Sequence, residues 1–232
     1  MAVESGQHSK DVLPGDASRL EQGPAFGMAL EKPAAPGDWP VYRHDTLRTS
    51  RTSAPLPAEL RDIWTAKVGA TPSAPTIAAG KVFVASAEEH TVRALDATNG
   101  KRLWSYTSGG RVKVPPTYHR GLCLFGSSDG YAYCLVAATG KLVWRFRAAR
   151  TPRRIVARER VESTWPVDEG VMVRDGLAYF AAGRHGQVDG GIDLYALDCS
   201  SGKLAWHKRL KGSYYPSLLA ADSTTLALSP RE

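Results

Sequence analysis

The residues best suited to chemistry gather in two stretches of the chain, 150–168 and 183–191. The first is rich in arginine and adds acidic residues and one tryptophan, and the second adds arginine, histidine and aspartate. A guanidinium fork pairs with carboxylates or phosphates and stacks on planar groups, and an indole offers a large amphipathic surface. The combination suits an anionic or planar ligand, or the centre of a protein interface. The candidate recognition residues are Arg153, Arg154, Glu162, Trp165, Arg184, His185 and Asp189.

Charge is concentrated in the same part of the chain. The net charge is +7, but residues 145–160 hold seven arginines against one acid, a local balance of +6 that leaves the remainder near +1. The plain alternative is therefore a solvated basic loop with an internal Arg–Glu pair. Nucleic acid would favour a longer basic track with interleaved aromatic residues, so a single tryptophan argues against such a partner.

Neither the histidines nor the cysteines form a recognisable site. His185 and Asp189 are the nearest pair to ligand spacing, and because two such residues do not define a metal centre, no metal is predicted. Cys123, Cys134 and Cys199 show no CxxC spacing and are expected to be buried free thiols. A bridge between Cys123 and Cys134 stays open, because it depends on the register of their hairpin.

The elements that must position these residues come from a repeat. Residues 94–104, ALDATNGKRLW, return as CLVAATGKLVW at 134–144 and as ALDCSSGKLAW at 196–206. Each copy has an apolar strand end, a polar turn closed by glycine and lysine, and a tryptophan four residues after the glycine. Trp64 and the three motif tryptophans, Trp104, Trp144 and Trp206, are separated by 40, 40 and 62 residues. A period near 40 in a chain rich in β-formers predicts the blades of a propeller.

The motif resembles the tryptophan-docking repeat of the PQQ-like β-propellers, the superfamily of quinoprotein dehydrogenases and of the outer-membrane β-barrel assembly lipoprotein. The resemblance covers roughly residues 55–229. It implies that each tryptophan packs on the motif alanine and against the motif of the next blade. The middle copy has Cys134 and Val136 in place of alanine and aspartate, so its turn is expected to lack one side-chain hydrogen bond. The structural docking residues that the resemblance implies are Ala94, Gly100, Trp104, Gly140, Trp144, Ala196, Gly202 and Trp206.

The predicted fold is an all-β, partial β-propeller: an open arc of about four four-stranded antiparallel blades. The blades are expected near residues 66–107, 112–147, 168–209 and, incompletely, 213–229. The central strands VFVA, LCLF and LAYF are apolar without alternation, which is typical of sheets buried on both faces. The third repeat carries 22 extra residues, placed as insertions at 150–166 and 183–191. Because strands in a blade alternate in direction, both insertions should decorate one rim, opposite the glycine–lysine turns.

The N-terminal part has a different composition. Residues 1–37 mix proline and glycine with polar residues and are interpreted as a mostly disordered leader or linker, with room for a helical turn at 18–22. Residues 38–45, DWPVYRHD, are expected to dock on the propeller as a first strand or a cap. The chain shows no signal-peptide core and no apolar run long enough to span a bilayer. Its compartment stays open, and a periplasmic site would follow if it belongs to a longer exported protein.

Two functional hypotheses follow. In the first, the chain is a non-catalytic binding or scaffold segment of a larger protein. It has no cofactor, its ring is completed by remaining blades or a second copy, and a protein partner binds the inserted rim. In the second, it is a fragment of a PQQ- and calcium-dependent quinoprotein dehydrogenase. The resemblance implies that such enzymes hold PQQ over a tryptophan, ligate calcium with acidic and amide side chains, use an aspartate base and often carry adjacent cysteines. Here no cysteines are adjacent, and Asp96 and Asp198 lie in structural turns.

Overall fold

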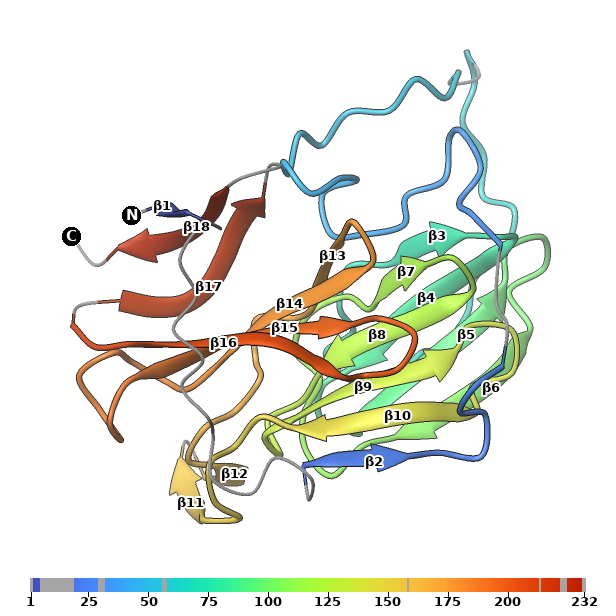
Figure 1. Ribbon diagram of the computed structural model, residues 1–232. Coiled ribbons are helices and arrows are strands. Elements are labelled where there is room, and N and C mark those ends of the chain that lie inside the picture. The colour runs from blue at the N-terminus through green and yellow to red at the C-terminus, as the bar shows by residue number, and fades with distance from the viewer. Residues whose placement is uncertain are drawn as a thin grey trace.

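The computed structural model describes residues 2–4, 19–28, 32–55, 58–157, 159–212, 214–221 and 225–230, and every regular element in these ranges is a β-strand. Three antiparallel sheets fan out side by side, and a fourth, smaller sheet follows them (Figure 1). The arc does not close on itself, so the predicted all-β, open propeller is confirmed. Within the described residues no helix has the length and apolar character needed to cross a membrane.

Three of the sheets are blades with at least four consecutive antiparallel strands. Blade 1 contains β3 (Thr76–Ala78), β4 (Lys81–Ser86), β5 (Thr91–Asp96) and β6 (Arg102–Thr107). Blade 2 contains β7 (Thr117–His119), β8 (Leu122–Gly126), β9 (Tyr131–Val136) and β10 (Leu142–Arg147). Blade 3 contains β13 (Met172–Arg174), β14 (Leu177–Ala182), β15 (Ile192–Asp198) and β16 (Leu204–Leu210).

The smaller sheet joins the two ends of the described chain. Its order is β1 (Ala2–Glu4), β18 (Thr225–Pro230) and β17 (Tyr214–Ala221), and each neighbouring pair is antiparallel. β17 contacts β14 and β15, so this C-terminal sheet stacks on the face of blade 3 that points away from blade 2. Residues 213 and 222–224 of the expected incomplete blade lie outside the described ranges.

The core lies between neighbouring blades, and the sheet of blade 2 is covered on both faces. All five residues of β8 are buried, as its unbroken apolar run predicts. Between blades 1 and 2, the rings of Phe125 and Tyr133 stack with centroids 5.1 Å apart. Between blades 2 and 3, Phe146 packs edge-on against Tyr195 at 5.5 Å.

The repeated motif folds into the same turn in all three blades. The glycine N–H donates to the carbonyl four residues earlier: Gly100 to Asp96 at 2.9 Å, and Gly140 to Val136 at 2.8 Å. In the third copy Gly202 donates to Asp198 at 2.8 Å. These glycines have φ between 66° and 72°, a region that side chains disfavour.

The middle copy has Val136 at the aspartate position, and its turn lacks the hydrogen bond that this carboxylate accepts in the other two copies. In the first turn the carboxylate of Asp96 accepts a hydrogen bond from the N–H of Thr98 at 2.8 Å, and in the third Asp198 accepts from Ser201 at 2.8 Å. The apolar side chain of Val136 has no oxygen to offer. The turn keeps its shape because its backbone hydrogen bonds are retained.

Each inner tryptophan contacts the motif of the following blade. The indole N–H of Trp104 donates to the carbonyl of Ala137 at 3.0 Å, and that of Trp144 donates to Cys199 at 2.9 Å. A Cβ atom on Gly140 would lie 2.7 Å from the ring of Trp104. The missing glycine side chain therefore makes room for the indole. Within its own blade, each ring faces a small residue across the ladder, Trp104 opposite Ala94 and Trp144 opposite Cys134.

The two outer tryptophans differ from this pair. Trp64 donates to the carbonyl of Ala97 at 3.0 Å and lies 2.6 Å from the position of a Cβ on Gly100, although residues 60–68 belong to no strand. Trp206 faces Ala196 across the ladder of blade 3 and packs on Tyr179 of the same blade, with ring centroids 6.0 Å apart.

Part of the leader forms a strand rather than a disordered segment or a helical turn. β2 (Leu20–Gln22) pairs antiparallel with β10 and becomes the fifth strand of blade 2. Arg19 is 3% exposed and donates to the carbonyl of Arg147 at 3.2 Å, while Glu21 accepts two bonds from Arg145 at 2.8 and 2.6 Å. The free edge of an outer strand attracts any segment that satisfies its backbone groups, and local composition does not show this. Residues 1, 5–18 and 29–31 of the leader lie outside the described ranges.

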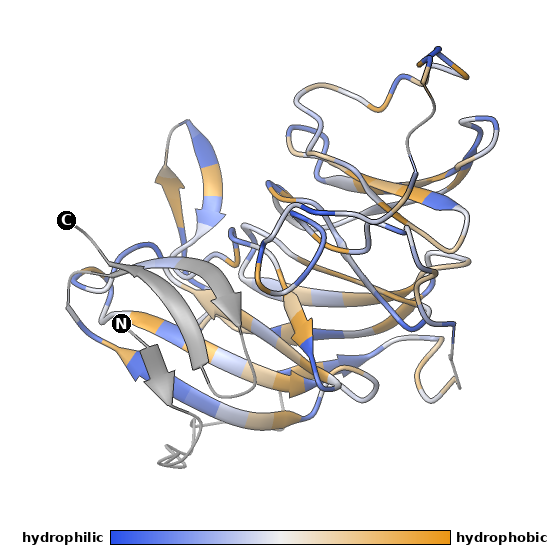
Figure 2. Cartoon of the chain, turned by 90° about the horizontal axis from the view of Figure 1, so that it is seen from above, coloured by the Kyte–Doolittle hydropathy of each residue, from blue (hydrophilic) through white to orange (hydrophobic). Residues whose placement is uncertain are grey.

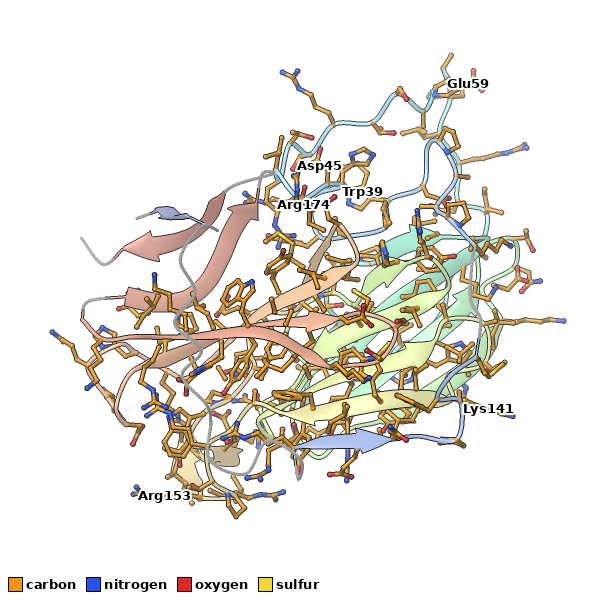
Figure 3. All side chains as sticks on the ribbon, viewed as in Figure 1. Trp39, Asp45, Glu59, Lys141, Arg153 and Arg174 are labelled. Atoms are coloured by element: carbon orange, nitrogen blue, oxygen red, sulfur yellow. The ribbon has the colours of Figure 1, made fainter. Side chains whose placement is uncertain are left out.

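Residues 38–45 dock on the propeller as expected. Trp39 forms a two-way backbone bridge with Ile77 at 2.7 and 2.8 Å, and the carbonyl of Pro40 accepts from Tyr118 at 2.8 Å. The carboxylate of Asp38 accepts from the N–H of Ala79 at 3.1 Å. The segment thus crosses the inner strands of blades 1 and 2 (Figure 3).

Replacing Trp144 with alanine should lower the free energy of unfolding by about 3–5 kcal/mol, because its fully buried ring fills the space between blades 2 and 3. Urea unfolding followed by circular dichroism measures the loss. Trp206→Ala is the matched control and should cost clearly less, since that ring is only half-buried. Equal losses in the two variants would contradict the assignment of Trp144 to the core between the blades.

Candidate functional site: the inserted rim

The two insertions lie side by side on one rim. Most of the first insertion folds into a hairpin of β11 (Arg154–Ala157) and β12 (Arg160–Ser163). Behind it, the indole N–H of Trp165 donates to the carbonyl of Asp189 at 3.2 Å, which ties the first insertion to the second. Figure 3 shows Arg153 on this rim and Lys141, beside a glycine–lysine turn, at the opposite end of blade 2.

A buried carboxylate anchors the base of the hairpin. Glu162 is 6% exposed and pairs with the guanidinium of Arg111, with Nη2 of Arg184 at 3.2 Å and with Nζ of Lys113 at 3.8 Å. Arg111 and Lys113 lie in the connection between blades 1 and 2, whereas Arg184 belongs to blade 3. A buried carboxylate is costly unless it is paired, so these cations hold Glu162 in place and link the blades through it.

Asp168 extends the same network toward blade 2. Its carboxylate pairs with Lys113 and accepts a hydrogen bond from the hydroxyl of Ser128 at 2.5 Å. Ser128 lies in the turn between β8 and β9. The ion pairs therefore connect the blades at the rim, on the side opposite the motif turns.

A second buried carboxylate holds the loop 183–191. Asp193 is fully buried and accepts hydrogen bonds from Arg150 at 2.5 Å, His207 at 2.9 Å and Arg209 at 3.0 Å. Burial would raise the pKa of Asp193, but the hydrogen bonds from His207, Arg150 and Arg209 outweigh it and lower the pKa from its ordinary value of 3.8 to about 2. The residue is therefore a carboxylate at neutral pH, and it fixes the three basic side chains around it.

Arg150 connects the buried Asp193 to the loop 183–191. It donates to the carbonyls of Asp189 at 3.2 Å and Gly190 at 3.1 Å, and its guanidinium lies 5.3 Å from the ring centre of Trp165. A guanidinium over an indole face adds cation–π attraction to these hydrogen bonds. One arginine thus fastens both insertions to the buried Asp193.

A cleft of about 330 Å³ opens between the hairpin and the C-terminal sheet. Charged groups of both signs line its wall, and most of them are already paired with one another in the ion network described above. The lining residues are Lys113, Ala157, Glu162, Pro166, Asp168, Glu169, Gly183, Arg184, Tyr215 and Pro216.

The predicted rim residues separate into three groups by exposure. Arg153 and Arg154 are exposed at the start of the hairpin. Glu162 and Trp165 are buried, 6% and 8% exposed, and support the rim from below. The sequence indicated a surface role for all of them because composition does not distinguish the two faces of an insertion.

The remaining three predicted residues are half-buried beside the cleft. Arg184 pairs with Glu162, and the carbonyl of Asp189 receives the indole of Trp165. His185 accepts a bond from the N–H of Gln187 at 3.2 Å and packs on Tyr215 at 5.3 Å. In the described ranges, no three histidine, cysteine, aspartate or glutamate side chains are grouped as a metal site would need.

Sequence reasoning missed Arg111, Lys113 and the Asp193–His207 pair. Arg111 lies 51 residues before Glu162, in the connection between blades 1 and 2, so no local pattern links them. Asp193 sits within an apolar strand, where a lone acidic residue signals a buried partner. That signal was available, but the identity of the partner was not.

The register of blade 2 settles the cysteine alternatives. Cys123 lies opposite Leu135 and Cys134 opposite Leu124, so the two thiols point to opposite faces of the sheet. Both are free and buried, as is Cys199. Burial, with a smaller contribution from the nearby Asp198, raises the pKa of Cys199 to about 12. These thiols act as small apolar residues in the core.

The sequence of this chain matches a known protein family. A family model described as outer membrane protein assembly factor BamB, built on the PQQ-like repeat, matches residues 61–164 and 128–230. The chain belongs to this family. No curated protein matches it in sequence.

Solved structures show the same fold in much larger proteins. Quinohemoprotein alcohol dehydrogenase ADHIIG from Pseudomonas putida HK5 superposes with a TM-score of 0.60 and 19% identity over 75% of this chain and 27% of that one. The quinohemoprotein alcohol dehydrogenase of Comamonas testosteroni superposes with a TM-score of 0.57 and 22% identity over 76% of this chain and 28% of that one. A europium-containing methanol dehydrogenase superposes with a TM-score of 0.57 and 18% identity over 77% of this chain and 33% of that one. The chain thus spans about a third or less of the length of these structures. At such identities the likeness concerns the fold.

The residues of this family member do not fit a quinone cofactor held with calcium. Asp96 and Asp198 direct their carboxylates into their own turns, and the three cysteines lie apart in the core. Two acidic side chains of the rim, Glu162 and Asp168, are already paired with basic ones. Among the residues that the structure describes, no acidic groups converge as a bound divalent ion requires.

The lowered pKa of the buried Asp193 should make the free energy of unfolding depend on pH under acidic conditions. Its folded-state pKa is depressed, so its contribution is fully present above about pH 4 and is lost as pH falls through about 2. The difference in unfolding free energy between the wild type and Asp193→Asn should therefore shrink by about 2 kcal/mol between about pH 5 and pH 2. Urea titrations at each pH measure it.

Asp175→Asn is the matched control, because Asp175 is exposed and pairs only with its neighbour Arg174. Its difference from the wild type should stay nearly flat over the same range. A flat difference for Asp193→Asn as well would show that the clamp does not hold its charge in the folded state.

Proposed function

We propose that this chain is a non-catalytic binding and scaffold module whose partner is a protein that docks on the inserted rim. One observation carries the proposal: the hairpin β11–β12 leaves Val156 and Val161 exposed, 76% and 61%, as directly opposed residues on one face. Blades 1 and 2 have no counterpart of this hairpin. Exposed apolar pairs flanked by arginine are typical of interface centres.

The chemistry of the hairpin indicates an acidic partner. Arg153, Arg154 and Arg160 are exposed around the valine pair, and Arg160 reaches Glu88 of blade 1 at 2.5 Å. A surface with carboxylates around a small apolar patch would complement this arrangement in charge and in hydrophobicity. Figure 2 shows a two-stranded hairpin standing away from the sheets, with hydrophobic and hydrophilic residues next to each other on it.

The hairpin has a rigid base, which favours recognition. Glu162 on β12 points inward to Arg111 and Arg184, while Val156 and Val161 lie on the other face. A site held in its binding geometry by buried contacts loses less conformational entropy when a partner arrives.

The tryptophans supply the scaffold in this proposal. The contacts of Trp104 with Gly140 and of Trp144 with Gly202 make the two rings fasteners between neighbouring blades. They leave the rim free to vary, because the motif turns lie at the opposite end of the sheets. A module of this kind can change its partner without changing its fold.

Reversing the charge of the rim should abolish partner capture without changing stability. A photoreactive residue at position 156 will form a covalent adduct with the partner in cells, and Arg153→Glu/Arg154→Glu should remove that adduct because it repels an acidic surface. The matched control, Lys101→Glu/Lys141→Glu, makes the same change of charge at exposed positions on the opposite rim and should keep the adduct. Adduct formation that is equal in both double variants argues against the rim.

Titration with PQQ and calcium tests the absence of quinone chemistry. We expect no saturable change in quinone absorbance and no dye-linked oxidation of alcohols, because the aspartates and cysteines are committed to turns and core. Tight binding accompanied by turnover would overturn the non-catalytic assignment and favour a dehydrogenase fragment.

A further inference from the structure

One charge in the cleft between the hairpin and the C-terminal sheet has no partner. The lining contains three acidic residues, Glu162, Asp168 and Glu169, against two basic ones, Lys113 and Arg184. Glu162 pairs with both basic residues, and Asp168 pairs with Lys113. Among the residues that the structure describes, the side chain of Glu169 makes neither an ion pair nor a hydrogen bond. The cleft therefore has one carboxylate to offer to a ligand.

This carboxylate lies at the open side of the cleft. Glu169 is exposed, whereas Glu162 is buried and Asp168 is half-buried. The side chain of Asp168 is fixed by Lys113 and by the hydroxyl of Ser128 at 2.5 Å, which anchors the backbone that carries Glu169. A carboxylate at the entrance of a partly enclosed space attracts a cation more strongly than one on a flat surface, because less water screens it.

An aromatic ring from the C-terminal sheet lines the same cleft. Tyr215, in β17, is 42% exposed. The imidazole of His185 packs edge-on against it, with ring centroids 5.3 Å apart and an angle of 81° between the planes. This contact supports the ring from blade 3 and leaves part of it open to solvent. An aromatic ring and an unpaired carboxylate in one cleft both attract a guanidinium or an ammonium group.

The rest of the lining suits the stem of a long side chain. Ala157, Pro166, Gly183 and Pro216 are small or apolar. Pro166 and Gly183 are buried, and the N–H of Gly183 donates to the carbonyl of Pro166 at 3.0 Å, which fixes this part of the wall. A basic side chain buries its methylene groups along such a surface and keeps its charged end near water. The volume of about 330 Å³ is small for a ligand pocket and suits a single side chain.

We propose that this cleft receives a basic side chain, an arginine in preference to a lysine, from the protein that docks on the inserted rim. Glu169 pairs with the guanidinium, and Tyr215 lies against it. Arginine is favoured because its planar group both forks onto a carboxylate and stacks on an aromatic ring. The inference rests on the proposed function, because the cleft adjoins the hairpin β11–β12 and Ala157 belongs to both.

The rim then requires opposite charges at two places on one partner. Arg153 and Arg154 attract carboxylates to the hairpin, whereas Glu169 attracts a cation to the cleft. A partner that docked in the reverse orientation would meet like charges at both places, which is unfavourable. The cleft thus determines the orientation of the partner as well as adding affinity.

Titration of the full chain with N-acetyl-arginine amide tests the cleft, because the guanidinium is the only charge of this probe. We expect a saturable shift of the Tyr215 ring resonances in nuclear magnetic resonance spectra. The amide of N-acetyl-citrulline, which has nearly the same shape and no charge, should give no such shift. Glu169→Gln should weaken binding of the arginine probe by about tenfold, because it removes the charge and keeps the size of the side chain.

Glu59→Gln is the matched control. It makes the same change at an exposed glutamate, and Figure 3 shows Glu59 at the opposite side of the molecule from Arg153 of the rim. This variant should bind the arginine probe as the wild type does. The proposal is overturned by the absence of a saturable shift, by equal binding of the citrulline probe, or by equal weakening in the two glutamine variants.

The partner adduct at position 156 separates this inference from the proposed function. Glu169→Gln should reduce the adduct, and Glu59→Gln should not. An undiminished adduct in Glu169→Gln that Arg153→Glu/Arg154→Glu still removes would overturn the inference and leave the proposed function in place. Saturable probe binding without any adduct would contradict the docked partner, and the cleft would then be assigned to a small free cation.

Discussion

The arrangement of the blades depends on a flat indole meeting a residue that has no side chain. Trp104 lies where a Cβ atom on Gly140 would stand, and its N–H reaches the carbonyl of Ala137 in the same turn. The contact buries a large apolar ring and satisfies its polar atom in one step, which few other residue pairs achieve. The contact recurs at Trp144, whose N–H reaches the carbonyl of Cys199 in the turn of the following blade.

A different type of contact links the blades at the opposite rim. There Glu162 and Asp168 pair with basic residues from neighbouring blades, and the buried Asp193 gathers three more basic side chains. Apolar contacts thus hold one end of the sheets and ion pairs hold the other. Buried ion pairs contribute less to stability than apolar packing but require a defined geometry. A rim built in this way holds an inserted hairpin in one orientation and leaves its outer face exposed.

The edges of the sheets show a third constraint. β2 covers the outer edge of blade 2 and brings Leu20 against Trp144 and the Gly202 turn, so a segment far away in sequence seals that junction. At blade 1 the corresponding indole, Trp64, comes from residues 60–68, which belong to no strand. Unpaired edges and uncovered flanks are unfavourable in water, and in this chain distant segments cover them wherever they reach.

The sequence by itself determined the repeat, the blade boundaries and the turn chemistry, including the hydrogen bond that the middle turn lacks. These features are local: a glycine at positive φ, an aspartate two or three residues before its hydrogen-bond donor and an unbroken apolar run each act within one blade. It also indicated that both insertions belong to one rim, because strand direction alternates. Only the tertiary structure decided which rim residues are buried, that Glu162 pairs with Arg111 and that β2 joins β10. The physical reason is that burial and ion pairing depend on neighbours brought together across blades, and no period in the chain encodes which distant groups will meet.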